Sequence, residues 1–312
     1  MGKRSLLLLM KPIEMYPVGQ SKNIINPKVV HFLENRTKVH RAAVKFCQDV
    51  LRRKDVLWKA VLRSDLSKPI NSVDMVVTVG GDGTLLQASH FLDDSIPVLG
   101  VNSDPTQIEQ VQEFENEFDA TRSTGYLCAA TVANFEQILD GILRDEIGAS
   151  KLSRISVSVN SEPVPSCALN DILMAHPSPA TVSKFSFKIR QDEDSYSPLA
   201  NCRSSGIRFS TAAGSTAAMR SAGGYRMPIL SRELQYMVRE PISPRPAVAH
   251  LMHGAVKSDQ SMEVSWYSEK GVIFMDGSFV HYTIKEGDTV EVSSKAPVLQ
   301  VFIPNQVQSD VN

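Results

Sequence analysis

The sequence has few cysteines, no long apolar run and almost no net charge. Four cysteines occur in 312 residues, widely spaced and without a Cys-x-x-Cys pair. This usage argues against a disulfide framework and a structural zinc site, and it suits a reducing compartment. No stretch approaches the ~18 apolar residues of a membrane-spanning helix. The formal net charge of −1 gives no general attraction to nucleic acid or to membranes, and we expect neither as a partner.

One short apolar run, Leu6–Met10, follows two basic residues near the start of the chain. It is shorter than the apolar core of a secretory signal peptide, and Lys11-Pro12 ends it without a small-residue cleavage site. We interpret it as a first β-strand. With no targeting signal recognised, we expect a cytoplasmic protein.

What the chain does contain is the composition of an ordinary globular protein, with 42% hydrophobic and 21% charged residues. Its length predicts about two domains. Apolar runs typical of buried strands alternate with helical patterns up to about residue 101, which favours a parallel α/β sheet. The strands are expected at Ser5–Met10, Val56–Leu62, Met75–Val79 and Ile96–Val101, and a helix is expected to begin at Asn26-Pro27.

The central motif is Gly80-Gly81-Asp82-Gly83-Thr84, between the strand Met75–Val79 and Leu85–Ser89, which can begin a helix. A strand, a glycine turn and a helix N-terminus together expose backbone N–H groups to an anion. We expect the glycines to allow positive φ and close approach of a ligand. Asp82 is an unusual residue for a phosphate-binding loop. It either helps to hold Mg²⁺, accepts a proton from an attacking hydroxyl, or only caps the turn.

The position of this motif supports a role in binding. In parallel α/β sheets, ligands bind beyond the carboxyl ends of the strands. The glycine motif lies at one such end, and the segment Gly100–Asp104, which includes Asn102, lies at another.

The hydrophobic period changes near residue 150. A helical stripe over residues 132–142 is followed by alternating patterns such as Ile155, Val157 and Val159, with turn signals at Lys270-Gly271 and Asp276-Gly277. We therefore predict an α/β domain over residues 1–149 and a β-rich domain over residues 150–297. The last strands, near residues 298–312, are expected to pack back on the first domain.

Two further motifs carry polar groups suited to a nucleotide. Asn170-Asp171 adjoins a strand and offers donors and acceptors for ribose hydroxyls or an adenine edge, although an Asx turn is the alternative. Residues 210–224 are rich in Ser, Thr, Ala and Gly, including Ser215, and suit close approach to a diphosphate or ribose. The alternative is a small-residue helix packed on the sheet. Arg203 and Arg220 flank this segment and are candidates to neutralise phosphate.

Together, these three ordered motifs resemble those of the NAD kinases. The resemblance implies a Rossmann-like α/β amino-terminal domain, a β-sandwich-like carboxy-terminal domain, and a dinucleotide bound in the cleft between them. It implies transfer of the γ-phosphoryl group of ATP to the 2′-hydroxyl of the adenosine ribose, with Mg²⁺ (or Mn²⁺) on the nucleotide and no metal held by protein ligands alone. It also implies a homodimer or higher oligomer.

The resemblance assigns roles to individual residues. Asp82 is implied to orient or deprotonate the acceptor hydroxyl, while Gly80, Gly81 and Thr84 complete the phosphate loop. The residues implied to line the acceptor site are Gly83, Asn170, Asp171, Thr216, Ala217, Ala218 and Ser221.

The segments Asp104–Gln107 and Ser204–Ala213 look most like the plant NADH kinase branch. The chain also departs from the usual family pattern at several positions. Asp171 stands where glutamate is usual, Ser205 replaces an aspartate, and Ala218 replaces a tyrosine. The stretch from Gly100 to Gln107 also lacks the usual Gly-x-Asn-x-Gly-x-Leu-Gly-Phe pattern. We interpret these changes as favouring NADH over NAD⁺.

Two other functions fit the glycine loop alone. A diacylglycerol- or sphingosine-type lipid kinase shares a related loop but leaves residues 210–224 unexplained. A catalytically silent dinucleotide sensor would be expected to have a broken loop, whereas Asp82 and all three glycines are present.

Overall fold

The computed structural model describes residues 2–13, 26–192 and 195–304. The chain forms two compact units. One contains the residues up to Ser150 together with the segment that begins at Gln300, and the other runs from Lys151 to Leu299. The chain therefore leaves the first unit, builds the second, and returns to the first.

The first unit is built on a sheet in the order β2-β1-β3-β4-β19-β6, with β5 paired to β4. Its strands are β1 (Ser5–Met10), β2 (Leu57–Leu62), β3 (Met75–Gly80), β4 (Val98–Asn102), β5 (Ala130–Thr131), β6 (Ser150–Leu152) and β19 (Leu299–Phe302). The pairs β1–β2, β1–β3, β3–β4, β4–β5 and β4–β19 are parallel. The four expected strands are thus confirmed, and β19 is the part of the expected closing strands that packs on this sheet. Residues 305–312 lie outside the described residues.

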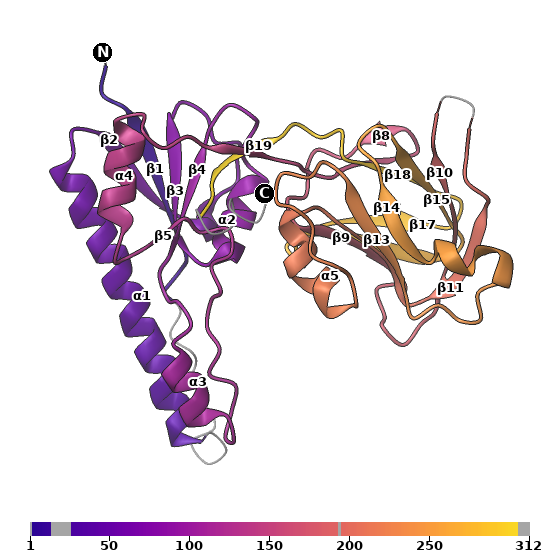
Figure 1. Ribbon diagram of the computed structural model, residues 1–312, viewed down its shortest axis with the longest axis horizontal. Helices are drawn as coiled ribbons and strands as arrows, with labels where there is room; N and C mark the ends of the chain where they lie inside the picture. The colour runs from indigo at the N-terminus through magenta and orange to yellow at the C-terminus, as the bar shows by residue number, and fades with distance from the viewer. Residues whose placement is uncertain (1, 14–25, 193–194, 305–312) are drawn as a thin grey trace. The chain divides into compact units, whose positions relative to one another are not determined.

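The described part of this unit also forms four α-helices, α1 (Pro27–Arg53), α2 (Asp82–Ser89), α3 (Ile108–Phe114) and α4 (Phe135–Leu143), with a 3₁₀ turn, η1 (Arg63–Asp65). The expected start of α1 is confirmed, because the Asn26 side chain accepts a hydrogen bond from the Lys28 N–H and Pro27 occupies the first turn. In Figure 1, α1 and α4 lie on one face of the sheet and α2 lies on the other. Apolar side chains of α1, α4 and the strands form one buried core.

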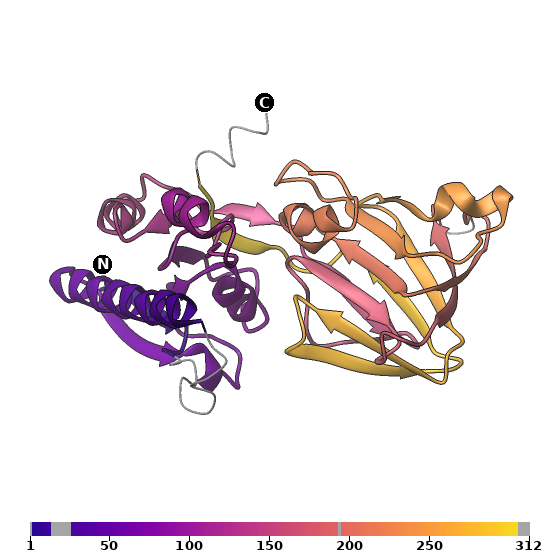
Figure 2. The ribbon, with the colours of Figure 1, turned by 90° about the horizontal axis from the view of Figure 1, so that it is seen from below.

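The second unit consists of two antiparallel sheets, visible in Figure 2. One has the order β11-β10-β15-β18-β7-β8, and the other has the order β14-β13-β12-β9-β16-β17. The strands are β7 (Ser156–Val159), β8 (Glu162–Pro163), β9 (Asp171–Ala175), β10 (Ser183–Arg190), β11 (Ala200–Ser204), β12 (Gly206–Ser210), β13 (Leu234–Arg239), β14 (His253–Val256), β15 (Ser261–Trp266), β16 (Lys270–Met275), β17 (Val280–Lys285) and β18 (Thr289–Ser293). The helical turns are η2 (Ala213–Thr216), α5 (Ala218–Ser221) and η3 (Pro246–Leu251).

One apolar core joins the two sheets of this unit, as in a β-sandwich. Phe187 of β10 meets Tyr236 of β13 edge-on, with ring centroids 5.8 Å apart, although the two strands belong to different sheets. The expected combination of an α/β unit and a β-sandwich-like unit is therefore confirmed.

The turn expected at Lys270-Gly271 is wrong, because both residues lie inside β16. Gly271 is required there by packing. A Cβ at this position would lie 2.6 Å from the buried Trp266 ring. The turn at Asp276-Gly277 is confirmed, since both residues have positive φ and connect β16 to β17. Among the described residues, no helix has the length and apolarity needed to cross a bilayer.

Candidate active site

The carboxyl ends of three parallel strands meet beside the glycine motif. Gly80, the last residue of β3, is in register with Asn102, the last residue of β4, and Lys11 follows β1 next to them. A small cavity of about 90 Å³ lies here, and its lining includes Lys11, His40, Gly80, Gly81, Asn102 and Ser123. The strand ends therefore gather polar groups as the α/β topology predicts.

The first two glycines of the motif are required for close packing. A Cβ on Gly80 would lie 2.2 Å from the Thr84 hydroxyl, and a Cβ on Gly81 would lie 2.3 Å from the Ser123 hydroxyl. The expectation of positive φ is wrong, because Gly80, Gly81 and Gly83 are not among the residues with φ above zero. The turn is tight because side chains of neighbouring segments press against it.

Gly83 differs from the other two glycines. It is exposed, and a Cβ there would meet only the tip of Arg63, 4.0 Å away. No contact within the first unit requires glycine at this position. A bare backbone at an exposed helix N-terminus leaves room for a ligand to approach.

Asp82 is the first residue of α2, and its carboxylate is held by the loop at residues 124–128. Oδ2 accepts a hydrogen bond from the Tyr126 N–H and Oδ1 accepts one from the Leu127 N–H, each at 2.9 Å. The thiol of Cys128 also lies 3.6 Å from Oδ1. A carboxylate has about four lone-pair sites. The two backbone bonds therefore fix its orientation, and the Thr124 hydroxyl, 3.5 Å from Oδ2, is a further, longer-range donor to it.

The Cys128 thiol stays protonated beside Asp82. Burial raises the pKa of this thiol well above its ordinary value, and the neighbouring Asp82 carboxylate raises it further. At neutral pH Cys128 is thus a hydrogen-bond donor to Asp82 and not a nucleophilic thiolate.

Residues 103–122, here called the excursion, connect the end of β4 to the loop that holds Asp82. The Asn102 side chain links the two ends of the excursion through hydrogen bonds. Its Oδ1 accepts from the Asp104 N–H, and its Nδ2 donates to the Ser123 carbonyl. Gly125 has a φ of +65°, and a Cβ there would lie 2.4 Å from Asn102. Asn102 was expected to bind the cofactor. Both ends of its amide are used in shaping this loop, and its contact with a ligand stays a prediction.

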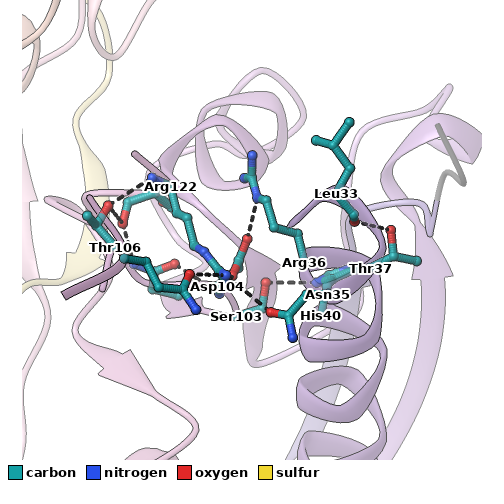
Figure 3. A network of polar contacts seen from close by, with 12 residues as sticks. Leu33, Asn35, Arg36, Thr37, His40, Ser103, Asp104, Thr106 and Arg122 are labelled. Carbon is teal, nitrogen blue, oxygen red and sulfur yellow. Dashed lines mark hydrogen bonds and ion pairs between the residues drawn. The ribbon is translucent and has the colours of Figure 1, made fainter. Parts of the chain in front are cut away.

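A buried polar network fastens the excursion to α1 (Figure 3). The Asp104 carboxylate accepts from Arg36 Nε at 2.8 Å and from Arg122 Nη1 at 2.5 Å. The Arg122 side chain is 0% exposed, and its guanidinium also donates to Gln110 and lies 5.0 Å from the centre of the Phe32 ring. Arg122 immediately precedes the loop that carries the N–H donors to Asp82.

His40 of α1 stands between two of the strand ends. Its Nδ1 lies 2.7 Å from the Ser103 hydroxyl, and its Nε2 lies 2.9 Å from the Lys11 carbonyl. Burial is the main cause that lowers the pKa of His40 below its ordinary value. The neutral ring accepts from Ser103 and donates to Lys11, which ties α1 to the cavity.

In the second unit, Asn170 and Asp171 lead into β9, and Asp276 holds their backbone. The Asp276 carboxylate accepts from the N–H groups of Leu169, Asn170 and Asp171 at 2.8, 2.7 and 3.0 Å. Burial raises the pKa of Asp276 to about 7, while these three hydrogen bonds act in the opposite direction. The Asp-Gly turn therefore serves as the support of the Asn-Asp motif.

The small-residue segment packs directly against that motif. Thr211 donates its N–H to the Asn170 carbonyl at 2.9 Å, and a Cβ on Gly214 would lie 2.1 Å from the same oxygen. Ser215 is fully buried, and its hydroxyl donates to Ala212 and accepts from the Met227 N–H. Its neighbours Ala217, Ala218 and Ser221 are exposed, and Thr216 is half-buried.

The structure places Arg203 away from this cluster and Arg208 within it. Arg203 is exposed on β11 at the edge of the other sheet, because the chain changes sheets at Ser205–Gly206. Arg208 of β12 forms an ion pair with Asp171 of β9. A contribution of Arg203 to phosphate binding stays a prediction without support from this cluster.

Sequence analysis thus missed five residues that contribute to these two sites. Arg208 carried a signal, since it is a charged residue inside the apolar strand Gly206–Ser210. The support role of Asp276, the backbone donors of Tyr126 and Leu127, and the position of His40 depend on contacts distant in sequence. No local pattern reveals them.

Comparison with known proteins identifies relatives over nearly the whole chain. A family model described as the ATP-NAD kinase N-terminal domain matches residues 15–106. The chain is 59% identical to the NADH kinase of Arabidopsis thaliana and 53% identical to a probable NADH kinase of Oryza sativa subsp. japonica. Each match covers 98% of both chains.

Solved structures show the same fold at low identity. An NAD kinase from Archaeoglobus fulgidus in complex with ATP gives a TM-score of 0.67 at 17% identity, over 98% of this chain and 96% of that chain. Yeast NADH kinase complexed with NADH gives 0.65 at 15% identity, over 96% and 83%.

The fold and the glycine loop define a two-domain protein whose α/β unit carries a glycine turn at the start of a helix and whose second unit is a β-sandwich. The relatives make the assignment specific: the chain belongs to the NAD kinase family.

Proposed function

We propose that this protein transfers the γ-phosphoryl group of ATP to the 2′-hydroxyl of the adenosine ribose of NADH, and of NAD⁺ less well. The observation that carries this proposal is the Asp82 carboxylate beside the glycine turn, oriented by two backbone N–H groups at 2.9 Å. Phosphoryl transfer needs positioning and charge stabilisation more than covalent help from the protein. The names of the plant relatives support NADH as an acceptor.

The roles in this mechanism follow the chemistry of each group. The N–H groups of the glycine turn receive the phosphates, with Gly83 and Thr84 at the start of α2. Asp82 accepts a hydrogen bond from the attacking hydroxyl and orients it. Asn170 and Asp171 bind the ribose or the adenine edge. The half-buried Thr216 and the exposed Ala217, Ala218 and Ser221 line the acceptor.

Magnesium fits this mechanism as a partner of the nucleotide. Among the described residues, no group of three or more His, Cys, Asp or Glu side chains is arranged to hold a metal ion. Mg²⁺ usually keeps several waters and is bound through substrate phosphates with one or two carboxylates. Asp82 is the carboxylate in the glycine motif. Mg²⁺, or Mn²⁺, would supply neutralisation of the triphosphate charge.

The remaining proposals concern assembly and location. We propose a homodimer in the cytoplasm, in keeping with the family resemblance and with the few scattered cysteines, all of them free. A lipid kinase or a silent sensor receives no support from the relatives described above.

The test is a paired assay of the purified protein with ATP and Mg²⁺, offered NADH or NAD⁺, with detection of the 2′-phosphorylated product. We expect product from both and a higher kcat/KM with NADH. Equal or higher kcat/KM with NAD⁺ would remove the NADH preference. No product from either acceptor would overturn the proposed function.

A further inference from the structure

Arg63 brings a positive charge to the N-terminus of α2. It begins η1 directly after β2, which runs parallel to β1 with Leu62 in register with Met10. Arg63 therefore lies at the same carboxyl edge of the sheet as the glycine motif. Its Nη1 lies 3.4 Å from the Thr84 hydroxyl, and 4.0 Å from the point that a Cβ on Gly83 would occupy. The guanidinium is thus next to the two residues at the start of α2 that we propose to receive phosphate.

The backbone of Arg63 is anchored to α2 itself. The side-chain amide of Gln87 donates to the Arg63 carbonyl at 3.0 Å, which fixes η1 against the helix whose N-terminus the guanidinium meets. The 3.4 Å contact with Thr84 is longer than the ~2.9 Å of a good N–H···O bond. A contact of this length is weak, so a phosphate oxygen can replace the Thr84 hydroxyl as acceptor at little cost.

The side-chain charge of the glycine motif is by itself unfavourable for phosphate. The only ionisable side chain of the motif is the Asp82 carboxylate, which repels a triphosphate. Two cations follow neighbouring strands at this edge, Lys11 after β1 and Arg63 after β2. Burial is the main cause that lowers the pKa of His40, and the charges of Lys11 and Arg63 lower it further. Both cations therefore act on the cavity beside the glycine turn, which His40 lines.

We propose that Arg63 binds the triphosphate of the phosphate donor, together with the N–H groups at the start of α2. This inference rests on the proposed function. A planar guanidinium can donate two parallel N–H bonds to a phosphate, and such charge-assisted bonds are roughly twice as strong as neutral ones. Arg63 also offsets the charge of Asp82, which allows a carboxylate to lie in a loop that receives phosphate.

The test measures how tightly the full-length protein and its Arg63→Met variant bind inorganic triphosphate in the presence of Mg²⁺. Methionine keeps an unbranched apolar stem but has neither the charge nor the N–H groups of arginine. We expect the dissociation constant of triphosphate to rise at least about tenfold, as for loss of a hydrogen bond to a charged group. The KM for ATP should rise with it, and it decides the comparison where triphosphate binds too weakly for calorimetry. The dissociation constant for NADH should stay within about twofold.

Two controls separate phosphate binding from a structural role. Arg63→Lys keeps the charge but not the planar fork, so its triphosphate affinity should lie between those of wild type and Arg63→Met. Lys59→Met removes the same charge from an exposed position in the middle of β2, in register with Leu7, and should leave triphosphate binding unchanged. A merely structural role of Arg63 would lower the thermal midpoint of unfolding without selectively weakening triphosphate binding.

The outcomes for Arg63 and for the proposed function are distinguishable. Weaker triphosphate binding in Arg63→Met, with NADH binding preserved, supports the inference. A triphosphate dissociation constant and a KM for ATP within about twofold of wild type would overturn it and leave the kinase activity in place. Where Arg63→Met does not fold, the uncharged variant Arg63→Gln provides the same comparison. Wild-type protein that binds triphosphate through Arg63 but phosphorylates neither dinucleotide would overturn the proposed function and leave the phosphate site in place.

Discussion

At the residue scale, Asp82 combines a half-buried place in the glycine turn with a fixed orientation. Changing Asp82 to Asn keeps one acceptor oxygen but sets an NH₂ group against a backbone N–H donor. We expect kcat to fall at least about 100-fold, as for loss of a group that orients a proton transfer. Steady-state kinetics with ATP and NADH measure this fall.

Two control measurements on Asp82→Asn are its dissociation constant for NADH and its thermal midpoint of unfolding. We expect the dissociation constant for NADH to change less than about threefold, because residues of the second unit carry the proposed acceptor contacts. The thermal midpoint should shift only slightly, since one of the two backbone hydrogen bonds is kept. A variant with wild-type kcat would remove Asp82 from the mechanism.

His40 predicts a pH dependence of stability. Because burial lowers its pKa in the folded state, the unfolded chain takes up a proton first as the pH falls below about 6.5. This contribution to the free energy of unfolding is present at pH 7 and is lost as the pH falls toward the folded-state pKa. Urea unfolding at pH 7 and pH 5.5 measures it.

The comparison protein for this measurement is His40→Gln, which cannot titrate in that range. The difference in free energy of unfolding between wild type and variant should shrink as the pH falls. Other groups, including Asp276, titrate in both proteins and cancel in the difference. A constant difference across this range would contradict the assignment of a neutral, buried His40.

At the element scale, the excursion of residues 103–122 decides where the Asp82 loop lies. Figure 3 shows Asp104 of the excursion between Arg36 of α1 and Arg122 at its end. Phe32 of α1 also contacts Phe114 and Phe118, with ring centroids 6.5 and 5.4 Å apart. Polar and aromatic contacts thus hold α3 against α1, which Figure 1 shows side by side.

Arg122→Met should therefore lower turnover through the loop. We expect a loss of stability of about 3 kcal/mol, as for breaking a buried ion pair, and a fall in kcat of at least about tenfold with a smaller change in the KM for NADH. The matched control is Arg144→Met, which removes an arginine from an exposed pair with Glu146 and should change neither. An Arg122→Met protein with unchanged kcat would show that the loop is positioned without this network.

At the scale of the whole molecule, the chain builds its first sheet from both ends. Strand β19 lies between β4 and β6, and its residues Leu299 and Val301 are fully buried. The second unit has a core of its own, formed by its two sheets. The first unit therefore needs the distant strand β19 to complete its sheet, whereas the second unit needs no strand from the first.

A chain of residues 151–299 is expected to fold alone, with a cooperative thermal transition by circular dichroism. A chain of residues 1–150 is expected not to, because removing β19 leaves Val98 and Leu99 of β4 unpaired on that edge and exposes apolar side chains. Joining residues 299–304 to residue 150 through a flexible linker should restore folding. Cooperative unfolding of residues 1–150 alone would contradict this account.

Local pattern was sufficient for the elements that place the glycine motif. The runs Ser5–Met10 and Met75–Val79 form strands where expected, and Asn26 caps α1, because strand length, β-branched content and capping chemistry act over a few residues. The reason for the glycines could not be read locally. Positions 81 and 271 have no room for a side chain because Ser123 and Trp266 pack against them. The residues next to each glycine in the sequence do not indicate either contact.

The sequence by itself determined the α/β character of the first part, the β character of the second, and the motifs that carry the chemistry. Only the tertiary structure decided how those motifs are held. The donors to Asp82 lie 44 and 45 residues along the chain, and Asp276 reaches back more than 100 residues to support Asn170. Arg208, and not Arg203, meets Asp171 because the chain changes sheets between them. Such contacts depend on strand order and register, which arise from packing of the whole sheet.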